Sequence, residues 1–143
     1  MPAHPGFGQF EKSHREFFDA LSEEGWRAVA GYEGVEEKIL SGAFDHVART
    51  GAVTRLSRWS AGASVTTPVA HEWCEEVFFV SGSLSIGTAS HEVRRMTAGT
   101  YAVRPPHVEH GPFFTHDGCL MIEFLYYPPQ PAAKAAGDAA SDD

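Results

Sequence analysis

The sequence predicts an all-β fold. Short segments rich in β-branched and aromatic residues recur along the chain, and glycine- or proline-containing pairs separate them at close intervals. No stretch of the main region sustains the spacing of apolar residues that marks a long amphipathic helix. Short strands with frequent turns and no helical period favour a β-sandwich or β-barrel.

Composition limits the chain to one ordinary domain with a proper core. It has 143 residues and a mass of 15.6 kDa, and 43% of the residues are hydrophobic against 21% charged. The formal net charge of −8 opposes binding to phosphate backbones and to anionic membrane surfaces. We therefore expect neither nucleic acid nor a membrane among the partners of this protein.

Residues 1–34 are expected to form an N-terminal arm laid against the main domain. Residues 11–21 place Phe17, Phe18 and Leu21 on one side of a short helix, and a strand is expected around residues 26–30. Glycines between these segments indicate turns. For the first ten residues, a partly ordered leader is an equally open interpretation.

Residues 35–127 are expected to form the main β domain. The candidate strands are residues 35–40, 53–59, 76–81, 84–86, 92–96, 99–103 and 120–127. Turn pairs such as Ser81-Gly82, Ala98-Gly99 and Pro105-Pro106 separate them. No internal repeat is present in the sequence, which argues against a propeller or a duplicated domain.

Residues 128–143 are rich in Ala, Pro and Asp and contain too few large apolar residues to pack, so we expect a mobile tail. A cytoplasmic location is expected, since no membrane-length apolar run or secretory leader is visible. Cys74 and Cys119 lie outside any Cys-x-x-Cys arrangement, so reduced thiols are expected, although the sequence leaves one disulfide open.

A first candidate site lies in residues 61–82. If residues 71–79 are one extended strand, His71, Trp73, Glu75, Val77 and Phe79 share one face. Most of that face is apolar, so a histidine and a carboxylate on it need a partner, a hydrogen bond or a metal ion. A buried His–Glu pair without metal is the alternative.

A second stretch, residues 99–113, favours a metal site over a His–Glu pair without metal. Gly99 opens a strand, Pro105 bends the chain, and His110 follows into an apolar run. If the bend brings His110 beside His71 and Glu75, two imidazoles and one carboxylate converge. Such a donor set is typical of non-haem iron sites and also suits Zn²⁺ or Mn²⁺, so a divalent metal ion is the expected cofactor.

These two stretches resemble the two motifs of small single-domain cupins. Glu75 and Gly82 match the end of the first motif, and His71 falls on the second of its two histidines. Gly99, Pro105 and His110 match the second motif with the family's spacing. The resemblance spans about residues 35–127 and extends to the cupin domain of zinc-binding anti-sigma factors, to cupin dioxygenases and to polyketide cyclases. It implies an RmlC-like jelly roll, that is, a double-stranded β-helix barrel.

Three positions depart from the family pattern. Val69 replaces the first histidine of the first motif, His107 stands where the second motif has glycine, and Phe114 replaces its terminal asparagine. The resemblance leaves His71, Glu75 and His110 as metal ligands. His107 is expected at the pocket or its rim, with a ligand role as the alternative.

Other residues near the motifs are expected to form the substrate pocket. The pocket set is Trp73, Phe79, Tyr101, Arg104 and His107. Arg104 is suited to a carboxylate, phenolate or enolate on the substrate, and a surface ion pair with Glu109 is the alternative.

The sequence thus predicts a metal-dependent cupin enzyme for a small apolar carbonyl or aromatic ketone compound. With iron, the resemblance implies dioxygenase-type C–C cleavage, and with zinc it implies a cyclase or isomerase. A non-enzymatic metal- or ligand-binding sensor is the alternative from another class. Glu75 is expected as a ligand or, where coordination is incomplete, as a general base. We also expect a homodimer.

Overall fold

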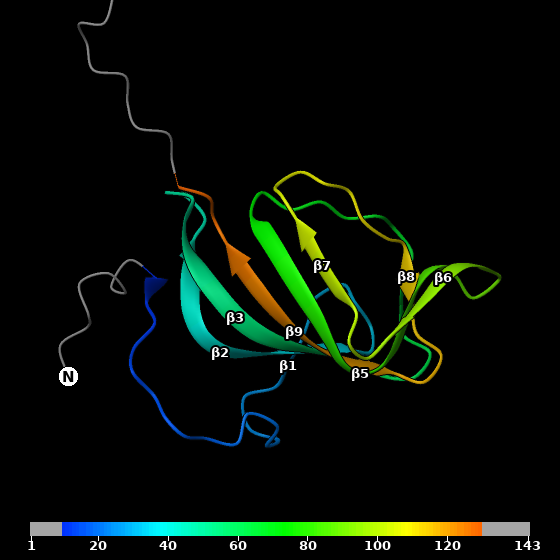
Figure 1. Cartoon of the computed structure of the whole chain (residues 1–143), viewed down its shortest axis with the longest axis horizontal. Coiled ribbons are helices and arrows are strands. Elements are labelled where there is room, and N and C mark those ends of the chain that lie inside the picture. The colour runs from blue at the N-terminus through cyan, green and yellow to red at the C-terminus, as the bar shows by residue number, and fades with distance from the viewer. Residues whose placement is uncertain (1–9, 130–143) are drawn as a thin grey trace, which may run out of the picture.

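The computed structural model describes residues 10–129 (Figure 1). Within this range the chain forms nine strands and no α-helix, so the prediction of an all-β fold is confirmed. The strands are β1 (Arg27–Ala28), β2 (Val35–Asp45), β3 (Thr50–Trp59), β4 (Ser64–Val65), β5 (Cys74–Thr88), β6 (His91–Thr97), β7 (Tyr101–Arg104), β8 (Phe113–Phe114) and β9 (Cys119–Tyr126).

The strands form two antiparallel sheets that share β5. The first sheet has the order β1-β2-β3-β9-β5-β7, and the second has the order β4-β8-β5-β6. Figure 1 shows the first sheet curling into a half-barrel, with β6 and β8 facing it from the other end of β5. Because β5 runs through both sheets, one face of this strand lines the space between them.

Strand β5 joins two segments that the sequence predicts as separate strands, residues 76–81 and 84–86. The pair Ser81-Gly82 is not a turn but a bend within a continuous strand, beside a register shift between Phe79 and Ser81. Gly82 has a φ of +75°, and a Cβ there would lie 2.1 Å from the carbonyl oxygen of Gly118. Only glycine fits this bend, which carries β5 from one sheet to the other.

The core lies between the two sheets. It gathers buried apolar side chains from both, and those of the cluster are Val35, Trp59, Ala63, Val65, Val77, Phe79, Leu84, Phe113, Cys119 and Met121. The odd-numbered residues face this core along β9 and along β5 as far as Phe79, as the period of two in a strand requires, and beyond the bend Leu84 and Ile86 take over. The same alternation places the functional side chains discussed below.

The N-terminal arm differs from its prediction. No α-helix forms over residues 11–21, and Phe17 and Leu21 are exposed. A helix this short is marginal unless its apolar face is buried, and of that face Phe17 is 98% and Leu21 58% exposed. The expected strand is present as β1, which pairs with β2. The Lys38 ammonium group donates to the carbonyl and hydroxyl oxygens of Ser22 and so ties the arm to β2.

The predicted division into an arm (1–34), a barrel (35–127) and a tail (128–143) stays a prediction, since most of the tail and residues 1–9 lie outside the described residues. Nowhere between residues 10 and 129 does a helix reach the length and apolarity that crossing a membrane requires.

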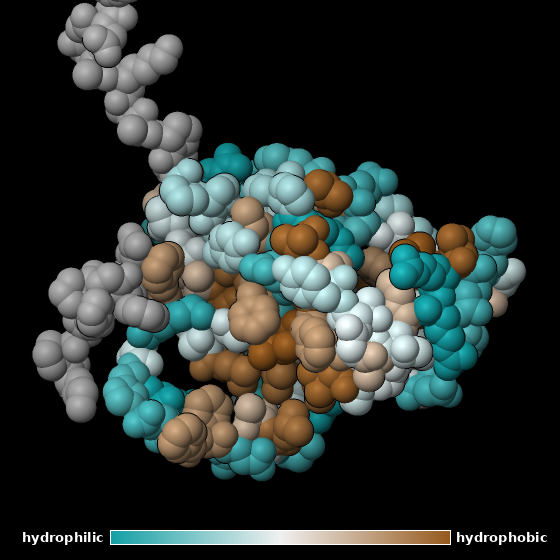
Figure 2. Space-filling view, viewed as in Figure 1, coloured by the Kyte–Doolittle hydropathy of each residue, from teal (hydrophilic) through white to brown (hydrophobic). Residues whose placement is uncertain are grey.

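The outer face of the first sheet carries apolar side chains in the open. Phe78, Val80, Tyr101, Val103 and Phe124 are each at least 42% exposed, and they lie on β5, β7 and β9, which are neighbours. Figure 2 shows apolar atoms gathered over the middle of this face. This outer apolar patch lies opposite the core side of the same strands.

Candidate metal centre and its cavity

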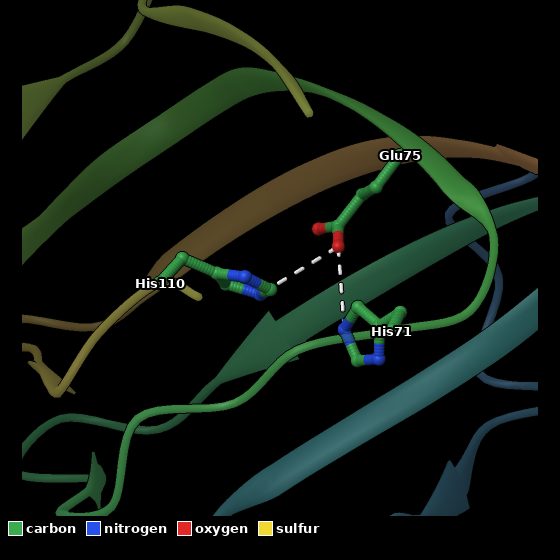
Figure 3. Close-up of side chains that lie close together, drawn as sticks. All are labelled: His71, Glu75 and His110. Carbon is green, nitrogen blue, oxygen red and sulfur yellow. Dashed lines mark ion pairs between the residues drawn. The ribbon is translucent and has the colours of Figure 1, made fainter. Parts of the chain in front are cut away.

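Two imidazoles converge on one carboxylate inside the half-barrel (Figure 3). The Oε2 atom of Glu75 lies 3.3 Å from Nε2 of His71 and 3.7 Å from Nε2 of His110. One ligand atom from each residue lies within 4.8 Å of the others. The three residues predicted from the two motifs are therefore brought together.

His71 reaches the site from a loop, not from the extended strand that the sequence analysis assumed. Strand β5 begins at Cys74, so the alternation argument applies from Glu75 onward and not to His71. The loop before β5 is instead held by the loop that carries His110. The N–H group of His107 donates to the carbonyl oxygen of His71 at 2.7 Å, and Val69 and His110 exchange two backbone hydrogen bonds.

Electrostatics keep the site ready for a cation. Burial raises the pKa of Glu75, but the nearby His71, His110 and Arg104 outweigh it and hold the pKa of this carboxyl below its ordinary value. Burial lowers the pKa of His110. The site therefore offers an ionised carboxylate and a neutral imidazole, which are the forms that bind metal ions.

Hydrogen bonding fixes which nitrogen of His110 faces the site. Its Nδ1 atom lies 3.1 Å from the carbonyl oxygen of Val108, and because a carbonyl only accepts, Nδ1 carries the proton. The lone pair is then on Nε2, the atom nearest Glu75. Metal-binding histidines are commonly oriented in this way.

The residues fit a divalent cation. Oε2 of Glu75 is buried and makes no hydrogen bond, although it lies between two imidazoles. A sealed carboxylate oxygen without a partner is costly, and a cation bound by the three donors removes that cost. The donor set of two histidines and one carboxylate suits Fe²⁺, Zn²⁺ or Mn²⁺.

The site opens onto a cavity of about 440 Å³ between the sheets. Its wall is largely apolar, with Val77, Leu84, Ile86, Phe113 and Met121 among the residues that line it. A volume of this order suits a small organic ligand.

The predicted pocket residues fall into two groups. Trp73, Phe79 and Arg104 line the cavity, and Nη1 of Arg104 lies 3.5 Å from Oε1 of Glu75. Tyr101 also borders it, but its side chain is exposed and its hydroxyl donates to Glu76 at 2.5 Å. It points outward because the alternate residues of β7, Ala102 and Arg104, face the cavity.

His107 is not part of the cavity wall, and its place at the rim stays a prediction. The residue is exposed. Its φ of +69° lets its N–H group reach the carbonyl oxygen of His71. The contribution of His107 that the structure describes is thus a backbone hydrogen bond that holds the loop of a candidate ligand.

An aromatic cluster supports His71. The ring of Trp73 stacks on His71 with centroids 4.8 Å apart and an interplanar angle of 10°. Phe44, His46 and Tyr127 also pack around Trp73, with ring centroids 5.2, 5.5 and 6.0 Å from it. This packing fixes the plane of the His71 ring.

Sequence reasoning missed three charged residues in the cavity. Arg55 donates from Nε to Glu123 at 2.8 Å and from Nη1 to Glu37 at 2.9 Å, and all three residues line the cavity. A signal was present, because Arg55 and Glu123 occupy odd positions between Val53 and Ser57 and between Met121 and Leu125. Charged residues on the apolar face of two neighbouring strands predict an internal pair.

Comparisons with known proteins agree with this architecture. The sequence matches the family model described as "ChrR Cupin-like domain" over residues 14–127. Among curated proteins, none matches the sequence.

Several solved structures share the fold. An RmlC-like cupin from Shewanella frigidimarina is 21% identical, with a TM-score of 0.59, over 84% of this chain and 96% of that one. An acetylacetone dioxygenase from Acinetobacter johnsonii is 16% identical, with a TM-score of 0.57, over 83% and 82% of the two chains. The anti-sigma factor ChrR of Rhodobacter sphaeroides, solved in complex with SigE, is 22% identical, with a TM-score of 0.50, over 69% and 46%.

Proposed function

Because the chain belongs to the ChrR cupin-like domain family, we propose that it is a metal-dependent cupin enzyme acting on a small, largely apolar carbonyl compound by oxygenative C–C cleavage. The observation that carries the proposal is the sealed Oε2 atom of Glu75, placed between two imidazoles at the wall of an apolar cavity. A cytoplasmic location and a homodimeric state belong to the same proposal.

The ligand set consists of His71, Glu75 and His110. A divalent ion bound there supplies Lewis-acid polarisation of a substrate oxygen and, where the ion is iron, reactivity toward O₂. The pairing of Glu75 with Arg104 orients the carboxylate, since Arg104 approaches Oε1 and leaves Oε2 toward the histidines.

Binding and orientation of the substrate fall to the cavity. Its apolar wall takes up the hydrocarbon part of the ligand and excludes water from the site. Arg104 lies at the site end of the cavity, where its guanidinium is placed to attract an enolate or phenolate oxygen. A ligand with an enolisable or phenolic oxygen at one end fits this distribution of charge.

The acetylacetone dioxygenase supports this function by analogy of fold. A zinc-dependent cyclase or isomerase uses the same ligands and the same polarisation of a carbonyl, and the identity of the metal separates these two reactions.

A sensor is the second candidate function. The family model carries the name of ChrR, and ChrR itself shares the fold in its complex with a sigma factor. This chain spans about half the length of that ChrR chain. For this function, a ligand or metal in the cavity would alter a partner surface and would not be converted.

Metal content is the decisive measurement. Tag-free protein purified without chelator is analysed by inductively coupled plasma mass spectrometry, beside a His110→Ala variant and a His91→Ala control. His91 is exposed on β6 and does not line the cavity. We expect near-stoichiometric metal in the wild type and the control, and loss of metal with unchanged circular dichroism in His110→Ala.

The outcome also assigns the reaction class. Iron, followed by oxygen consumption with acetylacetone or acetophenone, supports cleavage. Zinc without oxygen consumption favours the cyclase or isomerase reaction. Metal retained in His110→Ala contradicts the ligand assignment, and no metal after reconstitution favours the sensor without metal.

A further inference from the structure

A chain of three charged side chains lies in the cavity apart from the candidate metal centre. Arg55 on β3 bridges Glu123 on β9 and Glu37 on β2, at 2.8 Å and 2.9 Å. Arg27 on β1 binds the other oxygen of Glu37 at 3.0 Å. Glu123 is only 6% exposed. We call Arg55 and Glu123 the inner pair.

Sheet register places the inner pair one row from the metal centre. Glu75 lies opposite Arg104 and Leu125, whereas Glu123 lies opposite Val77 and Arg55. The two rows are two residues apart along the strands, which corresponds to about 7 Å. Both rows contribute side chains to the wall of the cavity, and Val77 lies in the same row as Glu123.

The inner pair keeps unused hydrogen-bonding atoms. Arg55 donates from Nε to Oε2 of Glu123 and from Nη1 to Glu37. Within residues 10–129, no side chain or backbone group pairs with Nη2 of Arg55 or Oε1 of Glu123. Neither atom is among the fully buried side-chain atoms that lack a hydrogen-bond partner. One donor and one acceptor are therefore left for a ligand in the cavity.

Burial makes this placement expensive for a purely structural pair. Burial raises the pKa of Glu123, and the negative charges of Glu75 and Glu37 raise it further. Arg55 acts in the opposite direction and does not cancel the rise. Burial also disfavours the charged form of Arg55, yet Glu123 and Glu37 raise its pKa above the ordinary value. A buried ion pair is often no more stable than apolar residues of similar volume, so stability alone does not account for it.

We propose that the inner pair binds a hydroxyl group at the far end of a ring-containing carbonyl ligand whose carbonyl oxygen lies at His71, Glu75 and His110. This inference rests on the proposed function and narrows its substrate class to hydroxylated cyclic or aromatic carbonyl compounds. The ligand hydroxyl donates to Oε1 of Glu123 and accepts from Nη2 of Arg55. A six-membered ring between the carbonyl group and the hydroxyl group of the ligand would bridge the separation between the two rows.

Charge favours a neutral hydroxyl over an anionic group at this place. The two carboxylates of Glu37 and Glu123 already match the two guanidinium groups of Arg27 and Arg55, so a ligand carboxylate would find no unpaired positive charge here. A hydroxyl is both donor and acceptor and matches the two unused atoms. A hydrogen atom in its place would leave both unsatisfied, which is the strongest form of discrimination by a polar site.

Isothermal titration calorimetry with two probes tests the proposal. Acetophenone and para-hydroxyacetophenone are titrated into wild-type protein, both as purified and reconstituted with Zn²⁺. We expect the hydroxylated probe to bind at least about tenfold more tightly, as one hydrogen bond to a charged partner implies.

Two variants and a control assign that preference to the inner pair. Glu123→Leu removes the acceptor, and Arg55→Met with Glu123→Leu removes both charges, which leaves Glu37 paired with Arg27 and no charge unpaired. Glu36→Gln changes a carboxylate that pairs with Arg58 and does not line the cavity. We expect the preference to disappear in a folded variant of either kind and to persist in Glu36→Gln.

The outcomes separate this inference from the proposed function. No preference in the wild type, or a preference that survives in both variants, overturns the inference even where Zn²⁺ is retained. A preference that depends on the inner pair supports it even if no metal is retained, and in that case the metal-dependent function alone fails.

Discussion

Val69 and His110 face each other across an antiparallel bridge. The N–H group of each donates to the carbonyl oxygen of the other, both at 2.9 Å. Two residues that exchange both bonds carry their side chains on the same face, and both of these residues line the cavity. Val69 is therefore adjacent to a candidate ligand, at the position where the cupin motif has its first histidine.

A Val69→His variant is expected to bind metal more tightly. The new imidazole would lie on the same side as His110 and add a fourth protein donor. We expect at least about tenfold higher affinity for Zn²⁺, equivalent to about 1.4 kcal/mol, in a competition titration with a chromophoric chelator. Val69→Leu controls for the change in volume, and equal affinity in all three proteins would show that position 69 does not reach the centre.

Trp73 is expected to act as a positioning residue for His71. Removing its ring in Trp73→Leu frees the His71 imidazole to rotate, so Zn²⁺ affinity should fall by about tenfold, as for other groups that orient metal ligands. In Trp26→Phe, which changes an indole stacked by Arg58 outside the cavity, affinity should not change.

Fluorescence gives this prediction a second readout. Zn²⁺ should alter the tryptophan emission of the wild type and of Trp26→Phe through the Trp73 ring stacked on His71. The response should be strongly reduced in Trp73→Leu, and an unchanged response there would place the effect at another tryptophan.

The Cys119 thiol is expected to be inert in the folded protein. Burial, aided by the negative charge of Glu123, raises its pKa to about 12. At pH 8 only about one molecule in ten thousand then carries the reactive thiolate. Ellman's reagent should modify Cys119 only after unfolding in guanidinium chloride, as a Cys74→Ser variant would show. Rapid modification of that variant under native conditions would contradict the burial of Cys119.

The homodimer stays a prediction, and the outer apolar patch is where a second copy gains most from contact. Its side chains lie on adjacent strands of an exposed face, an arrangement that commonly marks protein interfaces. Light scattering should give twice 15.6 kDa for the wild type. Phe78→Glu should shift the mass to a single chain, whereas a wild-type monomer at micromolar concentration would exclude the dimer.

Much of the site could be predicted from the sequence because motif spacing determines which residues meet. The two stretches supplied His71, Glu75 and His110, and the structure brings all three together. The reason given for His71 was nevertheless wrong. It lies in a loop, and backbone bonds from His107 and across the Val69–His110 bridge hold that loop in place. Such pairing between loops leaves no periodic signal.

Failures of prediction came where tertiary packing decided the outcome. Residues 11–21 have the pattern of an amphipathic helix, but no partner surface buries Phe17 within the described residues, so the helix does not form. The pair Ser81-Gly82 is typical of a turn, but the close approach of the Gly118 carbonyl oxygen to Gly82 places a bend inside β5 there. Arg55 and Glu123 are separated by most of the domain in sequence, and only the pairing of β3 with β9 brings them together.

The raised pKa of Glu123 predicts a defined pH dependence of stability. Its ordinary value is 4.5, and burial raises the value in the folded state. The unfolded chain therefore loses this proton at lower pH than the folded chain, so the contribution of Glu123 is complete below pH 4.5 and declines as pH rises through the folded pKa. Glu123→Gln has no such proton.

In urea unfolding at pH 4.5, 6 and 8, the free energy of unfolding of Glu123→Gln should therefore rise relative to that of the wild type as pH increases. Glu36→Gln, outside the cavity, should show no such trend. A trend of opposite sign for Glu123→Gln would mean that Arg55 holds the pKa of Glu123 below its ordinary value. The inner pair would then stabilise the fold at neutral pH.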